Sequence, residues 1–371
     1  MSHPRGQKLD RLVLVASLAF TGLVMGPGCG SEAGDPAASP DAGSSGTGSS
    51  GDTSSSTSTS SSSSSTSSSS GSSGADATPQ QAIKNVFIIV MENHSWATLK
   101  GNNNAPFINS LVSVGAHAEQ YFTPPGLHPS EPNYIWLEAG DNLGIDSDDD
   151  PDKNHRNDKD HLTTQLEAAK ISWKTYAQGA DGSKCPLTSS GFTGKYGVKH
   201  IPQLYFDDVT DTNSATSKRC MEHVRPFTEI DADLADPNKT PRYSFIVPDL
   251  CNDMHGANNF ECPVVDDSGN IKKGDDFLAS IVPKIQASAA YKNGGVIFIA
   301  WDEGDESFPN DASDGPIPFL AVGNMVKKGY IMNTKVDHSG LFRTLQTIFG
   351  VPYLRGAKTA KDFSEIFTQF P

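Results

Sequence analysis

Carboxylate, amide and imidazole side chains follow three of the apolar runs in this 371-residue sequence, at the points where the runs end, and a fourth pair opens a later apolar segment. These polar residues are Glu92, Asn93, Asp249, Asp253, His255, Asp302 and Glu303, with Asp337 and His338 as the fourth pair. In an open α/β sheet, ligands bind at the carboxyl ends of the strands, so these separated residues are expected to converge. Their atoms are ligands of divalent metals. The pattern predicts a metal-assisted hydrolase.

A single hydroxyl stands out in the central segment PPGLHPSEPNYIWLEAGDN. Ser130 precedes a helix-like apolar run through residues 135–137. At the first turn of a helix its hydroxyl would face free amides and the positive end of the helix dipole, a geometry that binds phosphate. The alternative is that Ser130 only caps the helix, with Pro132 early in it for conformational reasons. Both roles are compatible.

The elements that must position these residues follow from apolar periodicity. Strand-like runs lie at residues 86–90, 171–176, 243–247, 296–300 and 319–322. A helical face at 277–285 is opened by Asp275 or Asp276, and a second at 341–349 is ended by Gly350. Continuous apolar strands that alternate with helices predict an α/β fold with a doubly wound, mostly parallel sheet sandwiched by helices.

The irregular segment 179–241 is rich in Gly, Asp, Asn and Ser and contains two of the cysteines. We interpret it as an excursion beside the active site that shapes the substrate pocket. The acidic stretch 141–154 resembles calcium-binding loops only in composition, and a solvated loop is the expected structure.

The amino-terminal part of the chain has a different composition. Residues 1–29 combine basic residues, a short apolar run and a small-residue cleavage zone, which predicts a signal peptide. Cys29 stands where a lipoprotein would be acylated; the alternative is a cleaved soluble signal. The Ser/Gly/Thr-rich segment 30–79 predicts a disordered tether, and residues 80–371 one catalytic domain. The protein is expected to be exported, as an outer-membrane or cell-surface lipoprotein or in secreted form.

The net charge restricts the class of binding partner, and the cysteine content predicts disulfides. The net charge of −15 argues against nucleic acid, so an anionic substrate would have to be attracted locally by metal ions. Four cysteines in an exported domain predict two disulfides, and sequence order favours Cys185–Cys220 and Cys251–Cys262 among three possible pairings. Cys251 as a zinc ligand is the alternative. We expect a monomer that contacts a membrane only through the possible anchor at Cys29.

Five motifs in order, ENHSW, HPSEPNY, PDLCNDMHG, WDEGD and DHSGLFRT, resemble the bacterial phosphoesterase family of acid phosphatases and non-specific phospholipases C. The resemblance runs from about Asn85 to Ile348. It is closest to the short secreted acid phosphatase branch, which includes phosphatidylinositol 3-phosphate phosphatases. It implies the alkaline phosphatase superfamily, with an alkaline-phosphatase-like α/β sandwich and a metal-assisted hydroxyl nucleophile.

The resemblance also implies roles for particular residues. Ser130 matches the nucleophile, and Asn133 matches the amide that holds a nonbridging phosphoryl oxygen. The first metal would be held by Glu92, Asn93, Asp302 and Glu303. Residues in the regions of a second metal are Asp249, Asp253, His255 and His338, although a single-metal site is an alternative. His255 and His338 are candidates to assist the leaving oxygen, and the metal is Zn, Ca, Mg or Mn.

Some of these residues could instead have a purely structural role. Asp302 and Glu303 could be a solvated strand end, and Asp337 could be the N-cap of the final helix. His94 and His128 are expected to support ligands or contact substrate. The histidines without such context are expected on the surface: His117, His155, His161, His200 and His223.

The first choice of function is an exported phosphomonoesterase of acid phosphatase type, acting on phosphorylated small molecules or phosphoinositides. A phospholipase C that cleaves a phosphodiester is the nearest alternative. An alternative of another class is a non-catalytic surface lipoprotein that binds phosphate-bearing ligands.

Overall fold

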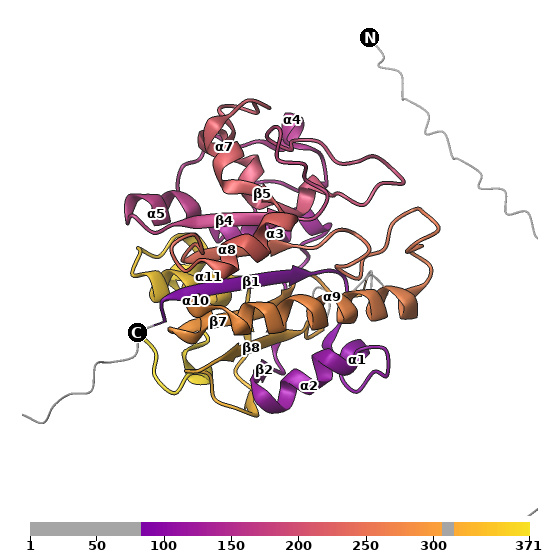
Figure 1. Cartoon of the computed structure of the whole chain (residues 1–371), viewed down its shortest axis with the longest axis vertical. Helices are drawn as coiled ribbons and strands as arrows, with labels where there is room; N and C mark the ends of the chain where they lie inside the picture. Colours follow the sequence, from indigo (N-terminus) through magenta and orange to yellow (C-terminus); the bar gives the residue numbers. More distant parts are fainter. Residues whose placement is uncertain (1–82, 306–314) are drawn as a thin grey trace, which may run out of the picture. The chain divides into compact units, whose positions relative to one another are not determined.

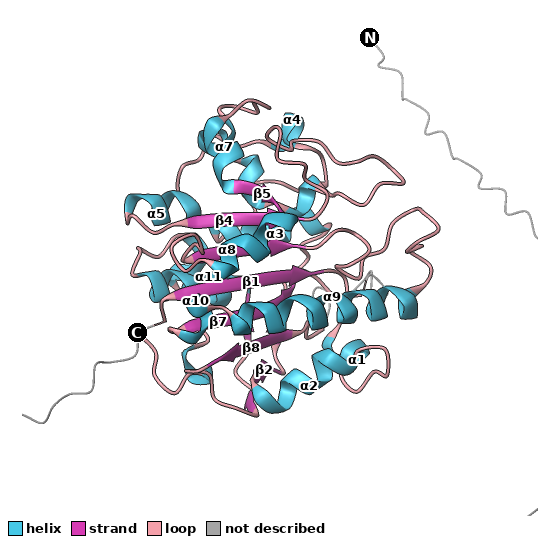
Figure 2. Ribbon diagram, viewed as in Figure 1, coloured by secondary structure: helices cyan, strands magenta, loops and turns pink. Residues whose placement is uncertain are grey.

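An eight-stranded sheet organises the part of the chain that the computed structural model describes, residues 83–305 and 315–371 (Figures 1 and 2). Its strand order is β5-β4-β6-β1-β7-β8-β2-β9. The bounds are β1 Asn85–Met91, β2 Ala116–Ala118, β4 Trp173–Ala177, β5 Val224–Pro226, β6 Tyr243–Val247, β7 Gly295–Trp301, β8 Phe319–Gly323 and β9 Tyr330–Met332. A separate parallel pair joins β3 (Tyr121–Phe122) to β10 (Val336–Asp337). The predicted signal peptide and tether lie outside the described residues.

The five strands from β5 to β7 are parallel, and β8 runs antiparallel to β7 and β2. β1 is the central strand, and it is buried from Val86 to Met91. Such a strand is apolar on both faces because helices cover both sides of the sheet. The mostly parallel α/β fold predicted from the sequence is confirmed, and all five predicted strands are present within two residues of their expected bounds.

Helices cover the sheet on both faces. The α-helices are α1 Trp96–Leu99, α2 Pro106–Val114, α3 Ser130–Ala139, α4 Pro151–Asn154, α5 Leu162–Ala168, α6 Asp207–Thr210, α7 Lys218–His223, α8 Ile230–Ala235, α9 Asp267–Ala287, α10 Ala289–Lys292 and α11 His338–Phe349. Short 3₁₀ turns are η1 Val198–His200, η2 Pro202–Tyr205, η3 Phe227–Glu229, η4 Arg355–Lys358 and η5 Ser364–Ile366. α9 packs with α2 and α10 and crosses one face in Figure 1, whereas α3 packs on α11.

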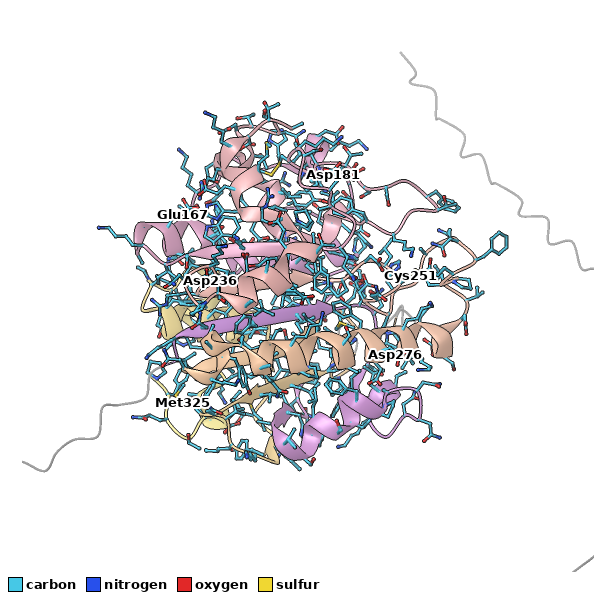
Figure 3. All side chains as sticks on the ribbon, in the orientation of Figure 1. Glu167, Asp181, Asp236, Cys251, Asp276 and Met325 are labelled. Carbon is cyan, nitrogen blue, oxygen red and sulfur yellow. A yellow bond between two sulfur atoms is a disulfide. The ribbon has the colours of Figure 1, made fainter. Side chains whose placement is uncertain are left out.

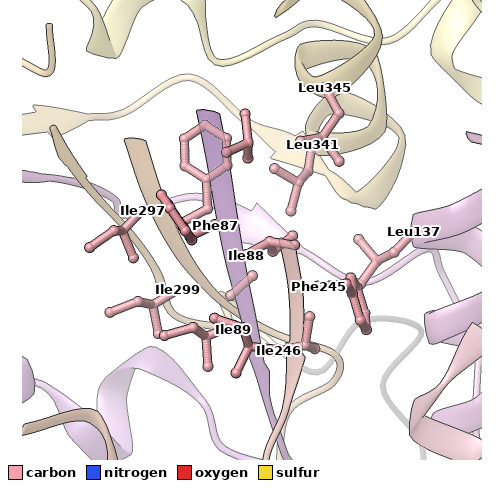
Figure 4. Close-up of a cluster of buried hydrophobic side chains, with 14 of the residues drawn as sticks. Phe87, Ile88, Ile89, Leu137, Phe245, Ile246, Ile297, Ile299, Leu341 and Leu345 are labelled. Atoms are coloured by element: carbon pink, nitrogen blue, oxygen red, sulfur yellow. The ribbon is translucent and has the colours of Figure 1, made fainter. Parts of the chain in front are cut away.

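Figure 4 shows the core between these layers. Leu341 and Leu345 of α11 and Leu137 of α3 gather on one side of the central strands, near Phe245. Ile297 of β7 lies on the other side. Burial of this apolar surface fixes the strands, and therefore fixes where their carboxyl ends lie.

One predicted helix boundary is wrong. α9 begins at Asp267 with Asp266 as its N-cap, about two turns before the predicted start. The carboxylate of Asp275 instead accepts hydrogen bonds from the backbone N–H groups of Phe107 and Ile108, in the first turn of α2. It caps a helix distant in sequence, which no local pattern reveals.

The final helix matches its prediction. α11 starts after Asp337, whose Oδ1 accepts from the Gly340 N–H at 3.1 Å. It ends at Gly350 in the left-handed conformation that a helix C-terminus favours. Asp337 is therefore the N-cap of α11, as one of the two interpretations of this residue predicted.

Both favoured disulfides are present, Cys185–Cys220 and Cys251–Cys262. Cys251 is therefore engaged in a disulfide and is not a thiolate ligand for zinc. In Figure 3, Cys251 lies on the side of the domain toward which β1 points. Among the described residues, no helix is long and apolar enough to cross a membrane.

Candidate active site

Ser130 is the first residue of α3 and is buried, 1% exposed. Pro129 occupies the N-cap position, so the interpretation of Ser130 as the N-cap is wrong. The Ser130 Oγ lies 3.0 Å from Oε2 of Glu92 and 3.2 Å from Oε1 of Glu303. A buried hydroxyl between two carboxylates at a helix N-terminus has acceptors for its proton and lies at the positive end of the helix dipole.

The two carboxylates belong to a buried acidic cluster formed by Glu92, Asp302 and Glu303, whose ligand atoms all lie within 4.8 Å of one another. They meet because β1 and β7 are paired in register up to Met91 and Trp301, the residues just before them. The solvated strand end considered for Asp302 and Glu303 is therefore wrong. The Asn93 backbone N–H donates to Asp302 Oδ1 at 3.4 Å, and its Nδ2 donates to Glu303 Oε1 at 3.2 Å.

The burial and close packing of these three carboxylates shift their pKa values. Burial raises the pKa of Asp302 well above its ordinary value, and the charge of Glu92 adds to the rise. Burial also raises the pKa of Glu303, although a hydrogen bond from His128 opposes it. Burial alone would raise the pKa of Glu92, but the neighbouring His200 lowers it below the usual range of a glutamate.

Several buried oxygen atoms in this cluster lack a hydrogen-bond partner within the described chain. They are Glu92 Oε1, Asn93 Oδ1, Asn133 Oδ1 and Asp302 Oδ2. Buried polar atoms without partners are rare in native proteins and call for an explanation. A divalent cation fits this donor set, because carboxylate and amide oxygens are its preferred ligands and its charge would offset theirs.

A second group of buried donors adjoins the first. His200 Nε2 lies 2.8 Å from Glu92 Oε1, and His200 Nδ1 lies 3.3 Å from Asp253 Oδ2. Its ring stacks on Tyr134 of α3, with centroids 4.8 Å apart. Burial would lower the pKa of His200, but Glu92 and Asp253 raise it to about 9. His200 therefore bridges Glu92 and Asp253 as a buried imidazolium, which offsets part of the negative charge of the acidic cluster.

A positive charge lies beside the nucleophile. Lys199 Nζ donates to Ser130 Oγ at 3.3 Å and lies 2.8 Å from Asp148 Oδ2. Burial would lower the pKa of Lys199, but Glu92 and Asp148 raise it above its usual range, so the ammonium stays charged. Asp148 also accepts from the Glu131 backbone N–H in α3. The acidic stretch around it is therefore not only a solvated loop, because it positions Lys199.

The chain was compared with known proteins, and residues 101–352 match the model described as "Phosphoesterase family". The chain belongs to the phosphoesterase family. It is 30% identical over 294 residues to the phosphatidylinositol-3-phosphatase of Mycobacterium tuberculosis, covering 79% of this chain and 86% of that protein. It is 26% identical to the phosphate-repressible acid phosphatase of Penicillium chrysogenum, covering 76% of this chain and 64% of the fungal protein.

Solved structures align with this chain at low sequence identity. A protein in the alkaline phosphatase superfamily from Vibrio parahaemolyticus aligns with a TM-score of 0.49 and 12% identity, over 76% of this chain and 71% of that one. The phosphoesterase is accordingly a hydrolase of phosphoric esters, as its family membership and its curated relatives establish.

Other predicted site residues of the phosphoesterase lie at the edge of this cluster. His255 Nδ1 donates to the Gly256 carbonyl at 2.7 Å, and its ring centroid lies 6.4 Å from that of His200. Asp249 Oδ1 accepts from the backbone N–H groups of Cys251 and Asn252, so it orders the turn after β6. Burial raises its pKa.

His338 lies behind the acidic cluster and is fully buried. Its Nε2 donates to the Asp302 carbonyl at 2.6 Å, and its Nδ1 lies 2.6 Å from the Tyr121 hydroxyl. Because the carbonyl can only accept, Nε2 carries the proton. These contacts hold the backbone of Asp302 in place.

The expectation that five histidines lie on the surface is wrong for His117, His161 and His200, which are buried. Each is buried against a carboxylate, which no local motif encodes. Lys199 and His200 were missed as site residues. The only signals were their place in the segment beside the active site and the apolar Val198 and Ile201 around them.

His94 and His128 lie as expected for supporting residues. His94 spans the Glu92 carbonyl and Asp267, and His128 Nδ1 lies 2.9 Å from Glu303 Oε2. Asn133 Nδ2 donates to Glu303 Oε2 at 3.0 Å and to the Leu127 carbonyl at 2.9 Å, so its amide hydrogens orient the cluster.

Proposed function

We propose that this phosphoesterase is an exported, metal-dependent phosphomonoesterase of acid phosphatase type that works through a phosphoserine at Ser130. The observation that carries the proposal is the Ser130 hydroxyl, held between Glu92 and Glu303 at the start of α3. A hydroxyl in this position is both a nucleophile and part of an anion-binding helix terminus.

The chain's own residues would prepare the attack. The Ser130 proton passes to Glu92 or Glu303, since both lie within hydrogen-bond distance. The Lys199 ammonium, 3.3 Å from Oγ, stabilises the resulting alkoxide. In the first turn of α3 only the Ser130 N–H is left to face an equatorial phosphoryl oxygen, because the Glu131 N–H donates to Asp148 and Pro132 has no N–H. Asn133 is proposed to hold another such oxygen by exchanging the hydrogen bond from its Nδ2 to Glu303 for one to substrate.

The proposed reaction consists of two successive displacements at phosphorus. The Ser130 oxygen forms a bond to phosphorus while the bond from phosphorus to the ester oxygen breaks, and the leaving alkoxide takes up a proton. His255 is the candidate donor, because its Nδ1–H is engaged by Gly256 and its Nε2 can carry a second proton. Water then attacks phosphorus, giving up a proton to His255, while the bond from phosphorus to the Ser130 oxygen breaks. The serine oxygen recovers its proton from Glu92 or Glu303, and inorganic phosphate leaves. His338 is proposed as a positioning residue through the Asp302 carbonyl.

A divalent cation would be held by Glu92, Asn93, Asp302 and Glu303. Asp253 is proposed to act through His200, which bridges it to Glu92, and Asp249 and Asp337 lie outside the metal set. When bound, such a cation supplies Lewis-acid stabilisation of phosphoryl charge and favours the ionised serine. The oxygen-rich set suits Mg, Ca or Mn.

Phosphomonoesters are proposed as substrates, including phosphatidylinositol 3-phosphate, because a relative that aligns over most of its length carries that activity in its name. A phospholipase C that cleaves phosphodiesters is the second candidate, since the same nucleophile and metals would serve it. Turnover of p-nitrophenyl phosphate against p-nitrophenylphosphorylcholine separates the two. The non-catalytic alternative loses its support, because the family is one of hydrolases.

Export is proposed from residues 1–29 as signal peptide and 30–79 as tether, with a lipid anchor at Cys29, ahead of a catalytic domain at 80–371. The two disulfides support an oxidising compartment. No nucleic acid partner is proposed, and the domain is proposed to be a monomer.

The decisive test replaces the nucleophile. Ser130→Ala should lower kcat on p-nitrophenyl phosphate by about 10⁴-fold or more, because the covalent route is lost. Its thermal unfolding midpoint should stay near that of the wild type. After acid quench with radiolabelled substrate, the wild type should carry label on Ser130. Turnover near the wild-type rate in Ser130→Ala would remove this residue from the mechanism.

A further inference from the structure

Two loops beside the active site expose large apolar side chains to solvent. Of the six exposed large hydrophobic residues in the described chain, four lie on these loops, which span 187–197 and 256–266: Phe192, Phe260, Val264 and Val265. Phe192 is 81% exposed and Phe260 is 107% exposed. We call these segments the apolar loops. Soluble monomers rarely gather such residues without an apolar partner.

The apolar loops are held rigid and held together. The first is closed where Tyr196 N–H donates to the Ser190 hydroxyl at 2.9 Å, so Phe192 lies at its tip. The second is closed by the Cys251–Cys262 disulfide, with Phe260 at its tip. These closures place both phenyl groups on fixed backbone rather than on a freely moving chain.

Polar contacts join one apolar loop to the other. Asn259 Nδ2 donates to the Thr193 carbonyl at 3.2 Å, and Lys195 Nζ lies 2.6 Å from Glu261 Oε2. The ion pair neutralises the charges nearest the two tips. Figure 1 shows both loops projecting on the side toward which β1 points, the side on which the acidic cluster lies.

One residue of the apolar loops, Val264, reaches the edge of the proposed site. Val264 lines a pocket of about 340 Å³ together with Asn93 and His255, residues of the proposed site. Val264 thus places the second apolar loop beside Asn93, whose side chain donates to Glu303 of the acidic cluster.

We infer that the apolar loops dock the enzyme onto the surface of a lipid bilayer, with Phe192 and Phe260 inserted among the acyl chains near the headgroups. A bilayer fits better than a protein groove, because the side chains project singly from two adjacent tips and form no groove or helix face. The net charge of −15 gives no attraction to anionic lipids, so insertion should be driven by apolar burial. The further claim that a docked lipid phosphate reaches Ser130 rests on the proposed function.

The test uses the chain from residue 30 onward, the form left after removal of the proposed signal peptide, so that neither the apolar run at 12–25 nor acylation of Cys29 can contribute. Wild type and the double variant Phe192→Ser/Phe260→Ser are sedimented with phosphatidylcholine vesicles. The variant should bind about tenfold more weakly or worse, because two buried phenyl groups are lost. The matched control is Val114→Ser/Ile331→Ser, which removes two exposed apolar side chains elsewhere and should bind as the wild type does.

Turnover of p-nitrophenyl phosphate separates this inference from the proposed function. The loop variant should retain wild-type turnover of the soluble substrate and lose it on phosphatidylinositol 3-phosphate in vesicles. Binding should change little between low and high salt. The inference is overturned if the wild type does not bind vesicles, if the loop variant binds equally well, or if salt abolishes binding. No turnover of either substrate by wild type that binds vesicles would instead contradict the proposed function.

Discussion

A buried acidic network lies at each end of α3, and the two differ in whether every carboxylate oxygen has a hydrogen-bond partner. At the start of the helix, Asp302 Oδ2 has no hydrogen-bond partner in the described chain, and Glu92 Oε1 has only the ion-pair contact with His200. At its end, Glu138 Oε1 accepts from His161 and from the backbone and hydroxyl of Thr163, and its Oε2 accepts from Gln203. Both networks are almost fully buried.

This difference separates a structural network from a reactive one. A buried carboxylate whose lone pairs are all satisfied stabilises one conformation and needs nothing further. A buried carboxylate with unpartnered oxygens is costly unless a cation neutralises it. The network at the end of α3 therefore holds the helix in place, and the cluster at its start is built for a charged ligand.

The largest expected effect comes from breaking the cluster at the start of the helix. Glu303→Gln should lower kcat/KM on p-nitrophenyl phosphate by about 10³-fold or more, because a proton acceptor and a cation ligand are lost together. Added divalent metal should raise the unfolding midpoint of the wild type and leave that of Glu303→Gln unchanged.

Glu138→Gln is the matched control at the other end of α3. It removes a carboxylate of similar burial and should lower stability while kcat of the folded fraction stays near the wild-type value. Equal loss of kcat in the two variants would contradict the assignment of one network to catalysis and the other to stability.

A smaller effect is expected from the charge beside the nucleophile. Lys199→Met should lower kcat by about 10²-fold, because one fixed donor to the developing oxyanion is removed. Lys199→Arg should recover part of that loss. Steady-state kinetics on p-nitrophenyl phosphate measures both, and an unchanged kcat in Lys199→Met would limit this residue to a structural role.

The smallest effect concerns pH and stability at the end of α3. Burial would lower the pKa of His161, but Asp208 and Glu138 raise it above its usual value. A raised folded pKa means that the stabilisation is complete below the unfolded pKa and is lost as pH rises through the folded pKa.

His161→Gln should therefore destabilise the protein by about 3 kcal/mol near pH 6 and by less near pH 9, since a buried pair is broken. Urea unfolding at the two pH values measures the difference. A cost that grows with pH would contradict the assigned sign.

Much of the site could be predicted because the sheet itself brings it together. Glu92 and Glu303 follow apolar strands that pair in parallel, so their meeting follows from the position of each strand end. Ser130 could be placed because its motif opens a helix.

Lys199 and His200 could not be placed in this way. Both lie in a single 3₁₀ turn, η1, within an irregular segment where no periodicity predicts which way a side chain points. The contacts of His200 with Glu92 and Asp253 depend on how that segment folds over the strand ends. Asp275 illustrates the same limit, because its role as a cap for α2 depends on tertiary packing.

The central claim is that the acidic cluster binds a divalent metal that the reaction requires. Measuring metal content together with activity tests it most directly. Wild-type protein purified without added ions, and the Glu303→Gln and Glu138→Gln variants, are analysed by mass spectrometry for divalent metals and assayed before and after exhaustive chelation. The account predicts bound divalent metal in wild type and Glu138→Gln, its loss in Glu303→Gln, and loss of activity on chelation that returns when metal is restored. Full activity in wild-type protein stripped of metal would contradict it.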